Sequence, residues 1–157
     1  MKIYYYKTRQ FLAADINTAW DFFSSAKNLA AITPPELDFK ILTDVGKKDI
    51  YEGMLIEYKI KPLFGIPLHW QTEIRQIKKP EMFTDKQLKG PYKIWEHTHI
   101  FIQKEKGVLM KDEVKYQLPF GIFGQVAHLL IVRKKIERIF NYRKKILNKI
   151  FIEWKQY

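Results

Sequence analysis

The most regular pattern of apolar and polar positions runs from Gly121 to Trp154 and predicts one long amphipathic helix. Apolar side chains recur at steps of three and four residues, the spacing that places side chains on one helical face. The apolar stripe consists of Val126, Leu129, Ile136, Ile139, Phe140, Ile146, Leu147, Ile150 and Trp154, whereas Lys134, Lys135, Arg138, Lys145 and Lys149 point away from it. Such a helix needs a broad apolar partner on one side and water on the other.

The length of this helix is large for the chain. At roughly 1.5 Å per residue the helix would span on the order of 50 Å. A compact domain of this size is only about 40 Å across. We therefore expect the far end of the helix to kink or to project from the body of the protein.

The start of the chain predicts a strand followed by two short helices. Ile3 to Ala13 is rich in Tyr, Phe, Thr and Gln with loose alternation, which is typical of a strand covered partly on both faces. Asp15 is placed to cap one helix, and Ser25 is placed to cap a second helix that runs to Ile32. A Pro-Pro pair then ends the second helix.

From Leu37 onward the apolar positions alternate, and short turn signals separate six further strands. Short connections make neighbouring strands antiparallel. We find no repeat, low-complexity segment or linker. The sequence therefore predicts a single α+β domain over residues 1–157, with a curved antiparallel sheet of about seven strands wrapped around the C-terminal helix and two short helices between strands 1 and 2.

Alternation also assigns strand residues to the inner or the outer face of the sheet, because successive side chains point to opposite sides. The inner face would carry an unusual mixture of polar and aromatic residues, namely Tyr58, Trp70, Thr72, Asp85, Gln87, Trp95, His97, His99, Asp112 and Tyr116. A buried polar group without a partner costs on the order of 1 to 3 kcal/mol, so the set implies a mutually bonded network or a wet cavity. We favour a cavity for a small molecule, and a filled structural network is the alternative.

Composition narrows the class of protein. The chain has 157 residues, of which 46% are hydrophobic, enough for one domain with a sizeable core. The absence of cysteine excludes disulfide scaffolds, thiolate nucleophiles and cysteine metal sites, and it fits a reducing compartment. The N-terminus has no signal-peptide core, and no apolar run nears the roughly 20 residues of a membrane span. We therefore expect a cytoplasmic protein.

Charge raises the question of a partner. The formal net charge is +11, and the stretch from Arg133 to Lys149 holds eight Lys or Arg residues against one Glu. The simplest interpretation is a solvated helix face, and an anionic membrane surface or a nucleic acid is the alternative. Gly121 to Gly124 has only the outline of a nucleic-acid GxxG loop and is better placed to begin the helix, so nucleic acid is the less favoured partner.

Several short segments along nearly the whole chain carry a family resemblance. They are Ile32 to Pro35, Ile56 to Tyr58 with Pro62 and Trp70, Gln87 with Lys89 to Tyr92, Trp95 to Phe101, Leu118 to Gly121, and Ile139 to Arg143. In these segments the chain resembles a bacterial branch of the SRPBCC, or START-like, superfamily, some members of which are labelled cell-division inhibitors. The resemblance implies the helix-grip fold of the birch pollen allergen. It also implies a deep cavity for hydrophobic ligands such as lipids, sterols or polyketides.

Three candidate chemistries remain open at the inner face. His97 and His99 lie two residues apart on one strand, so both can point inward, and Asp112 could complete an open metal site. The same histidines could form an acid/base pair with Asp112 or Asp85, although histidines bonded to interior carboxylates are the commoner case. Arg143 falls inside the apolar stripe, where it either enters the cavity or packs its stem and pairs with a carboxylate.

The sequence thus leaves three classes of function in play. The favoured class is a protein that binds a hydrophobic or amphipathic small molecule without a cofactor, with carrying or sensing of that molecule as further options. The second class is a polyketide cyclase- or lyase-like enzyme in the same cavity, for which no nucleophile elbow, phosphate loop or Rossmann fingerprint is present. The third is an interaction module that uses the basic helix. The sequence assigns no catalytic or metal-binding residue, and it leaves the oligomeric state open.

Overall fold

A computed structural model describes residues 2–46, 49–63 and 65–153. The strands are β1 (Tyr4–Leu12), β2 (Lys40–Ile41), β3 (Leu55–Leu63), β4 (Ile66–Lys78), β5 (Met82–Lys89), β6 (Ile94–Lys104) and β7 (Gly107–Gln117). Within the described residues they form one antiparallel sheet of seven strands in the order β1-β7-β6-β5-β4-β3-β2. The first strand leaves the order of the meander, because β1 pairs with β7 and lies at one edge of the sheet, with β2 at the other edge.

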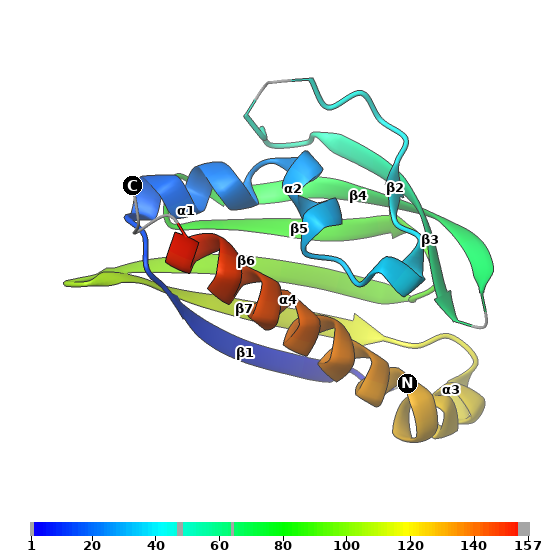
Figure 1. The fold of residues 1–157 in the computed structure, drawn as a ribbon. Helices are drawn as coiled ribbons and strands as arrows, with labels where there is room; N and C mark the ends of the chain where they lie inside the picture. The colour runs from blue at the N-terminus through cyan, green and yellow to red at the C-terminus, as the bar shows by residue number, and fades with distance from the viewer. Residues whose placement is uncertain (1, 47–48, 64, 154–157) are drawn as a thin grey trace.

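The helices cover the inner face of the curved sheet. They are α1 (Ile16–Phe23), α2 (Ala26–Ala31), the 3-10 turn η1 (Pro35–Leu37), α3 (Gly121–Ala127), the π-helical turn η2 (His128–Val132) and α4 (Arg133–Glu153). Figure 1 shows α4 lying across the sheet with α1 and α2 beside it on the same side. The α+β helix-grip fold and the two short helices between the first two strands are therefore confirmed.

The pairing of the strands sets which side chains meet on the inner face. Along β7 every second residue is buried, as one covered face requires. Asp85 on β5 lies opposite His97 on β6, and His99 lies opposite Asp112 on β7. The predicted sharing of one face by these four residues is confirmed.

The two short helices begin where the sequence predicts. The side chain of Asp15 accepts hydrogen bonds from the backbone N–H groups of Asn17 and Thr18, each at 3.0 Å, so it caps α1. Ser25 precedes α2 as expected, but its side chain makes no capping hydrogen bond. Trp20 anchors α1 because its ring is buried against the sheet.

The C-terminal helical segment departs from the prediction at its beginning. The prediction that Val126 and Leu129 belong to the buried stripe is wrong, because both side chains are exposed. The irregular turn is η2, near the start of the segment, and the far end stays packed at least as far as the buried Phe151. Trp154 lies outside the described residues. No helix in the described part of the chain is both long and apolar enough to cross a membrane.

Candidate functional site

A cavity lies between the inner face of the sheet and the helices. The space open to the centre of a water molecule is about 160 Å³. Strands β3 to β6 form the floor, α4 forms one wall, and the end of α1 together with α2 and the segment after it forms the other. An apolar cavity of about 150 Å³ is known to take up benzene, so this one has room for about one ring or a short acyl chain.

Eight of the eleven predicted site residues surround this cavity. Tyr58, Trp70, Thr72, Asp85, Trp95, His97, His99 and Arg143 line it, whereas Gln87, Asp112 and Tyr116 do not. The lining follows from the alternation of the strands and, for Arg143, from the inward face of α4. Whether these residues contact a ligand stays a prediction.

One side of the cavity is an aromatic wall. The ring centroids of Trp70 and Trp95 are 5.4 Å apart, and those of Tyr92 and Trp95 are 4.6 Å apart. Beside them the hydroxyl of Tyr58 donates a hydrogen bond of 3.0 Å to the hydroxyl of Thr72. These polar groups therefore need no ligand, and the wall offers mainly apolar surface.

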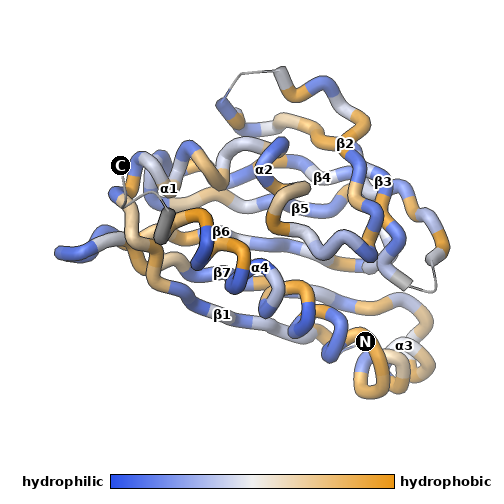
Figure 2. The backbone as a smooth tube through the Cα atoms, viewed as in Figure 1, coloured by the Kyte–Doolittle hydropathy of each residue, from blue (hydrophilic) through white to orange (hydrophobic). Residues whose placement is uncertain are grey.

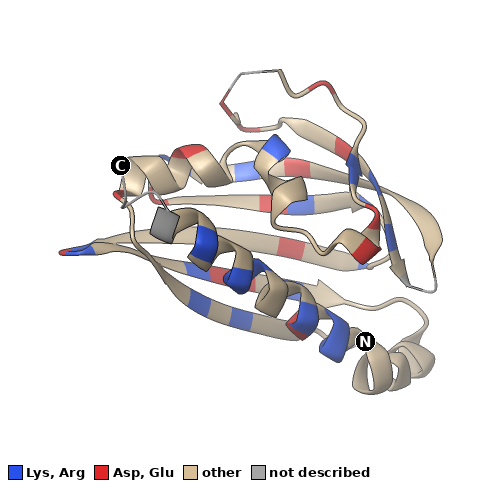
Figure 3. Ribbon diagram, viewed as in Figure 1, with Lys and Arg blue, Asp and Glu red and all other residues tan. Residues whose placement is uncertain are grey.

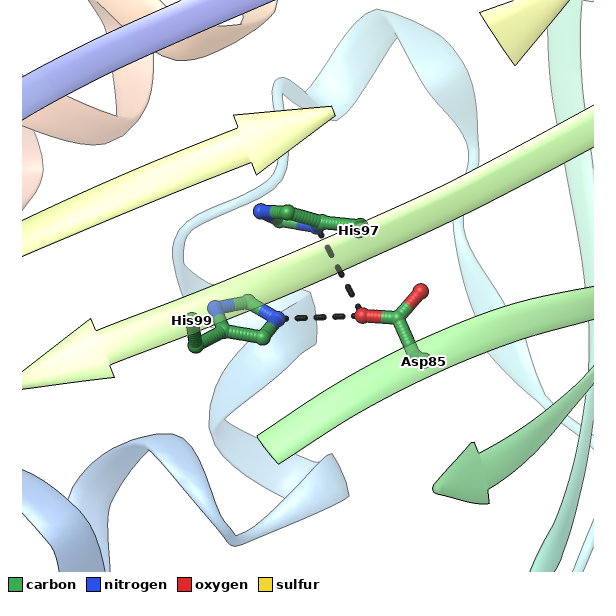
Figure 4. A group of neighbouring side chains, drawn as sticks. All are labelled: Asp85, His97 and His99. Atoms are coloured by element: carbon green, nitrogen blue, oxygen red, sulfur yellow. Dashed lines mark hydrogen bonds and ion pairs between the residues drawn. The ribbon is translucent and has the colours of Figure 1, made fainter. Parts of the chain in front are cut away.

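Next to this wall, on the same face of β6, the cavity holds a cluster of charged and polar side chains. Figure 4 shows the carboxylate of Asp85 facing both histidines of β6. Its Oδ2 atom lies 3.0 Å from Nε2 of His99 and 3.5 Å from Nδ1 of His97. One carboxylate therefore bridges two imidazole rings, whose centroids are only 3.9 Å apart.

Asp112 completes the cluster from behind the histidines. Its Oδ1 atom lies 2.7 Å from Nε2 of His97 and 3.2 Å from Nδ1 of His99. The same oxygen lies 3.6 Å from Nη1 of Arg143, which reaches in from α4. All of these side chains except Asp85 are buried, and Asp85 keeps part of its surface exposed where it lines the cavity.

The pKa shifts describe a cluster that balances its own charge. Burial alone would raise the pKa of Asp85 and of Asp112, but the histidines and Arg143 outweigh burial and hold both pKa values below 3.8. Burial and the nearby charge of His99 lower the pKa of His97, whereas contacts with Asp112 and Asp85 outweigh burial and raise the pKa of His99. The neighbouring carboxylates therefore favour the charged form of His99, whereas burial favours the neutral form of His97.

The cluster also has the outline of a metal site. Asp85, His97 and His99 offer ligand atoms within 4.8 Å of one another. However, Nε2 of His97 and Nε2 of His99 are already hydrogen-bonded to carboxylates, and the guanidinium of Arg143 adds a positive charge beside them. A divalent cation would have to displace these bonds and lie near that charge. The donor set therefore fits a hydrogen-bonded network better than a metal centre.

Four nitrogen atoms of the cavity-lining residues lack a hydrogen-bond partner within the described chain, namely Nε1 of Trp70, Nδ1 of His99, and Nε and Nη1 of Arg143. Two of them face Asp112, whose Oδ1 atom lies 3.2 Å from Nδ1 of His99 and 3.6 Å from Nη1 of Arg143. The atoms of Trp70 and Arg143 act only as hydrogen-bond donors. Buried donors usually have a hydrogen-bond partner, so their accumulation in one cavity suits a ligand that accepts hydrogen bonds.

Gln87 and Tyr116 also lie on the inner face of the sheet, but each forms a hydrogen bond that fixes a neighbouring segment of the chain. The amide of Gln87 donates a hydrogen bond of 2.6 Å to the carbonyl of Tyr92, which fixes the turn between β5 and β6. The hydroxyl of Tyr116 and Nε2 of His128 are 2.8 Å apart, which ties η2 to β7. Both side chains are satisfied within the protein.

Sequence reasoning missed the part of the wall that the helices supply. Phe23 at the end of α1, Leu29 on α2, and Ile136 and Phe140 on α4 line the cavity. Phe140 also lies 5.0 Å from the guanidinium carbon of Arg143, so its ring covers that charge. The helical period identified the inward side of α4, but it gave no signal for which residues of the short helices face the same space.

Comparison with known proteins was informative only at the level of structure. No protein-family model and no curated protein matched the sequence. A START superfamily protein from Mycobacterium smegmatis is 10% identical to the chain, with a TM-score of 0.70 over 96% of this chain and 98% of that one. Norcoclaurine synthase from Thalictrum flavum, in complex with dopamine and hydroxybenzaldehyde, is 14% identical, with a TM-score of 0.64 over 94% and 88% of the two chains.

A third solved structure is the di-domain ARO/CYC protein StfQ from the steffimycin biosynthetic pathway. It is 8% identical, with a TM-score of 0.63 over 94% of this chain and 52% of that one. At such identities the likeness shows the fold alone. The resemblance to START-like proteins is therefore confirmed as a shared fold, and the chemistry has to be argued from the cavity.

Proposed function

We propose that this chain, which has the fold of a START superfamily protein, binds a small amphipathic molecule in the cavity between its sheet and α4. The ligand has an apolar body of about one ring or a short acyl chain and an acidic end group that accepts hydrogen bonds. Binding rather than catalysis is favoured because the cluster of Asp85, His97, His99 and Asp112 is already mutually bonded.

The observation that carries the proposal is the set of unpaired donors in the cavity wall. Nε and Nη1 of Arg143 can donate to one acceptor group, although Nη1 also lies 3.6 Å from Oδ1 of Asp112, and Nε1 of Trp70 is a further donor in the cavity wall. A carboxylate suits a guanidinium best, because the two groups form short, charge-assisted hydrogen bonds. The aromatic rings of Tyr92 and Trp95 then provide surface for the apolar body.

The volume of the cavity restricts the size of the ligand. A space of about 160 Å³ is well below the roughly 300 to 1,000 Å³ of sites for drug-sized ligands. A sterol or a long acyl chain would therefore require α4 or α2 to move outward. Small monocyclic acids are the class that the cavity accommodates without such a movement.

A matched pair of ligands tests the proposal. Phenylacetate and 2-phenylethanol share one ring and differ in the acidic group, and isothermal titration calorimetry measures the affinity of each. We expect phenylacetate to bind roughly tenfold or more tightly, since hydrogen bonds to charged groups are worth about 1.5 to 3 kcal/mol. Equal affinities, or no binding of either, would refute the assigned end group.

Replacement of the arginine locates the effect. Arg143→Met keeps the bulk of the side chain and removes its donors, so the preference for phenylacetate should disappear. Lys145→Met is the matched control, because Lys145 lies on the same helix but is exposed. If Lys145→Met removed the preference as well, general charge rather than the cavity would be responsible.

A proton-transfer reaction in the same cavity is a second candidate. It is favoured by the opposite directions of the pKa shifts of His97 and His99, which favour the neutral form of one imidazole and the charged form of its neighbour, with ring centroids 3.9 Å apart. In that case His99→Gln would leave binding of the substrate nearly intact and reduce turnover by roughly a hundredfold. In a protein that only binds its ligand, the same variant would alter affinity or stability alone.

A further inference from the structure

The C-terminal helical segment begins with apolar side chains that the rest of the described chain leaves uncovered. We call them the α3 surface, which consists of Phe120, Ile122, Phe123, Val126, Leu129 and Leu130, with 50% to 84% of each residue exposed. Figure 2 shows this end of the molecule as hydrophobic. Figure 3 shows that α3 carries no acidic or basic residue.

The opposite side of the segment is anchored to the sheet, so the α3 surface is held outward. Gly124, His128 and Val132 are buried, and a Cβ atom at Gly124 would collide with the carbonyl oxygen of Pro119. The ring of His128 stacks on Tyr4 with centroids 3.6 Å apart. The segment is therefore apolar on both sides, and only one side has a partner within the described chain.

The exposure is too concentrated to be incidental. Contiguous apolar surface of this kind on a folded protein marks an interaction site, whereas scattered single side chains do not. Phe120 adds a further sign, because its φ of 68° lies in the left-handed region that a bulky residue rarely adopts. The backbone is strained at the position where an aromatic ring is directed into solvent.

Basic residues border the α3 surface. Arg133, Lys134, Lys135 and Arg138 follow it in the first turns of α4, where Figure 3 colours Lys and Arg residues blue along the ribbon. Of these, Arg133, Lys134 and Arg138 are exposed. A second copy of the chain would not suit this face, because two-fold pairing would bring the same basic residues together. The charges instead match an anionic partner.

We propose that the α3 surface and the adjoining basic residues dock the protein onto the interface of an anionic lipid bilayer. Phe120, Phe123 and their apolar neighbours would enter the boundary between head groups and acyl chains, as amphipathic interfacial helices do. Lys134 and Lys135 would lie against the lipid phosphates, where each basic residue adds to the attraction. The docking needs no ligand in the cavity and stands apart from the proposed function.

The position of this surface also suggests what docking would achieve. A shallow groove adjoins it, lined on one side by Leu130 and Ile131 and on the other by Pro34 and η1. Leu37 and Ile139 line both this groove and the cavity, so they separate the two spaces. An amphipathic ligand could pass from the bilayer to the cavity by displacing them, a step that does rest on the proposed function.

Co-sedimentation with lipid vesicles tests the docking. The vesicles consist of phosphatidylcholine alone or of phosphatidylcholine with about one third phosphatidylglycerol, at low and at physiological salt. We expect binding to the anionic vesicles to be at least tenfold stronger than to the neutral ones and to weaken as salt rises. Absence of binding to anionic vesicles at low salt would overturn the proposal.

Paired variants identify the surface responsible. Phe120→Ser combined with Phe123→Ser should reduce the partition coefficient at least tenfold, because two large apolar side chains no longer enter the bilayer. Tyr51→Ser combined with Leu88→Ser is the matched control, since these exposed apolar residues lie on other parts of the molecule. Equal loss in both pairs would overturn the assignment of the α3 surface.

Two further readouts separate the alternatives. Lys134→Gln with Lys135→Gln should weaken binding about fivefold or more and flatten its salt dependence. Sedimentation velocity should show a monomer, and a dimer that only the double Phe variant dissociates would overturn the proposal in favour of a second copy as occupant. Calorimetry with phenylacetate should give the same affinity for the double Phe variant, so that failure of docking and failure of the cavity ligand are told apart.

Discussion

The cavity and the α3 surface reverse the usual distribution of residues in opposite ways. The cavity wall and Asp112 behind it place two carboxylates, two histidines and an arginine in the interior, while the α3 surface places large apolar side chains in solvent. The interior charges are tolerated because each one faces a group of opposite charge within 3.6 Å. The exposed apolar side chains are not covered by any other part of the described chain. The charges of the first region are thus paired within the protein, apart from a few hydrogen-bond donors. The second region requires a partner outside the described chain.

The largest expected effect follows from removing one charge of the interior cluster. Asp112→Asn leaves Arg143 and His99 facing one carboxylate in place of two, so the free energy of unfolding should fall by about 3 to 5 kcal/mol. Urea denaturation measures the change. The neighbouring Glu113→Gln is the control, because its exposed pair with Lys7 contributes at most about 1 kcal/mol. Similar losses in both variants would show that the cluster is not special.

Acid should lower the stability that the same cluster provides, without any substitution. Asp85 and Asp112 have pKa values below 3.8 in the folded state, so they stabilise the protein above that pH and the stability is lost as pH falls further. The lowered pKa of His97 adds a loss of stability as pH falls below about 6.5, where the stabilisation by His99 is already complete. The raised pKa of His99 adds a loss of stability as pH rises above about 6.5. Urea midpoints should therefore be highest near about pH 6.5, fall gently on either side and decline steeply below about 4. Midpoints that stay constant from about pH 8 to 5 would contradict these opposite shifts.

A smaller effect is expected where the segment that carries the α3 surface is anchored to the sheet. Tyr116→Phe removes the hydrogen bond to His128 and leaves that imidazole buried without a partner, which should lower the free energy of unfolding by about 1 to 2 kcal/mol. The loss should be accompanied by faster amide hydrogen exchange in η2, which this bond ties to the sheet. Faster exchange spread evenly over β7 would indicate instead that Tyr116 stabilises the sheet itself.

The smallest effect is expected at Phe120. Phe120→Gly relieves the left-handed strain, but glycine gains entropy in the unfolded chain, so the free energy of unfolding should change by less than about 0.5 kcal/mol. The side chain makes almost no packing contribution because it is 81% exposed. Thermal unfolding measures the change, and Phe123→Gly, which introduces glycine within α3, is the contrasting variant with the larger loss. A large destabilisation by Phe120→Gly would show that the ring is packed in solution.

Much of the fold and of the cavity wall could be predicted because strands repeat every two residues. Once one face of β6 is covered, His97 and His99 must both point inward, and the same rule places Asp85 and Asp112 beside them. The rule does not say what covers each end of the sheet. Gln87 and Asp112 therefore have the predicted orientation but lie beside or behind the cavity wall.

The C-terminal segment shows where periodicity is insufficient. Residues 121–132 contain no charged side chain, so the pattern could not tell which of two apolar sides faces the sheet. Leu129 was placed on the buried side for that reason and is exposed. The proximity of Arg143 to Asp112 was also beyond the pattern, because it depends on how α4 crosses the sheet.

The central claim is that the unpaired donors of the cavity receive an acidic ligand, and nuclear magnetic resonance observes these donors directly. The Nε–H signal of Arg143 and the Nε1–H signal of Trp70 are followed in ¹⁵N-labelled protein during titration with phenylacetate. We predict that both signals move downfield and saturate together, while the Nε1–H signal of Trp20, which lies outside the cavity wall, stays in place. Binding that leaves the signals of Arg143 and Trp70 unchanged would contradict the account.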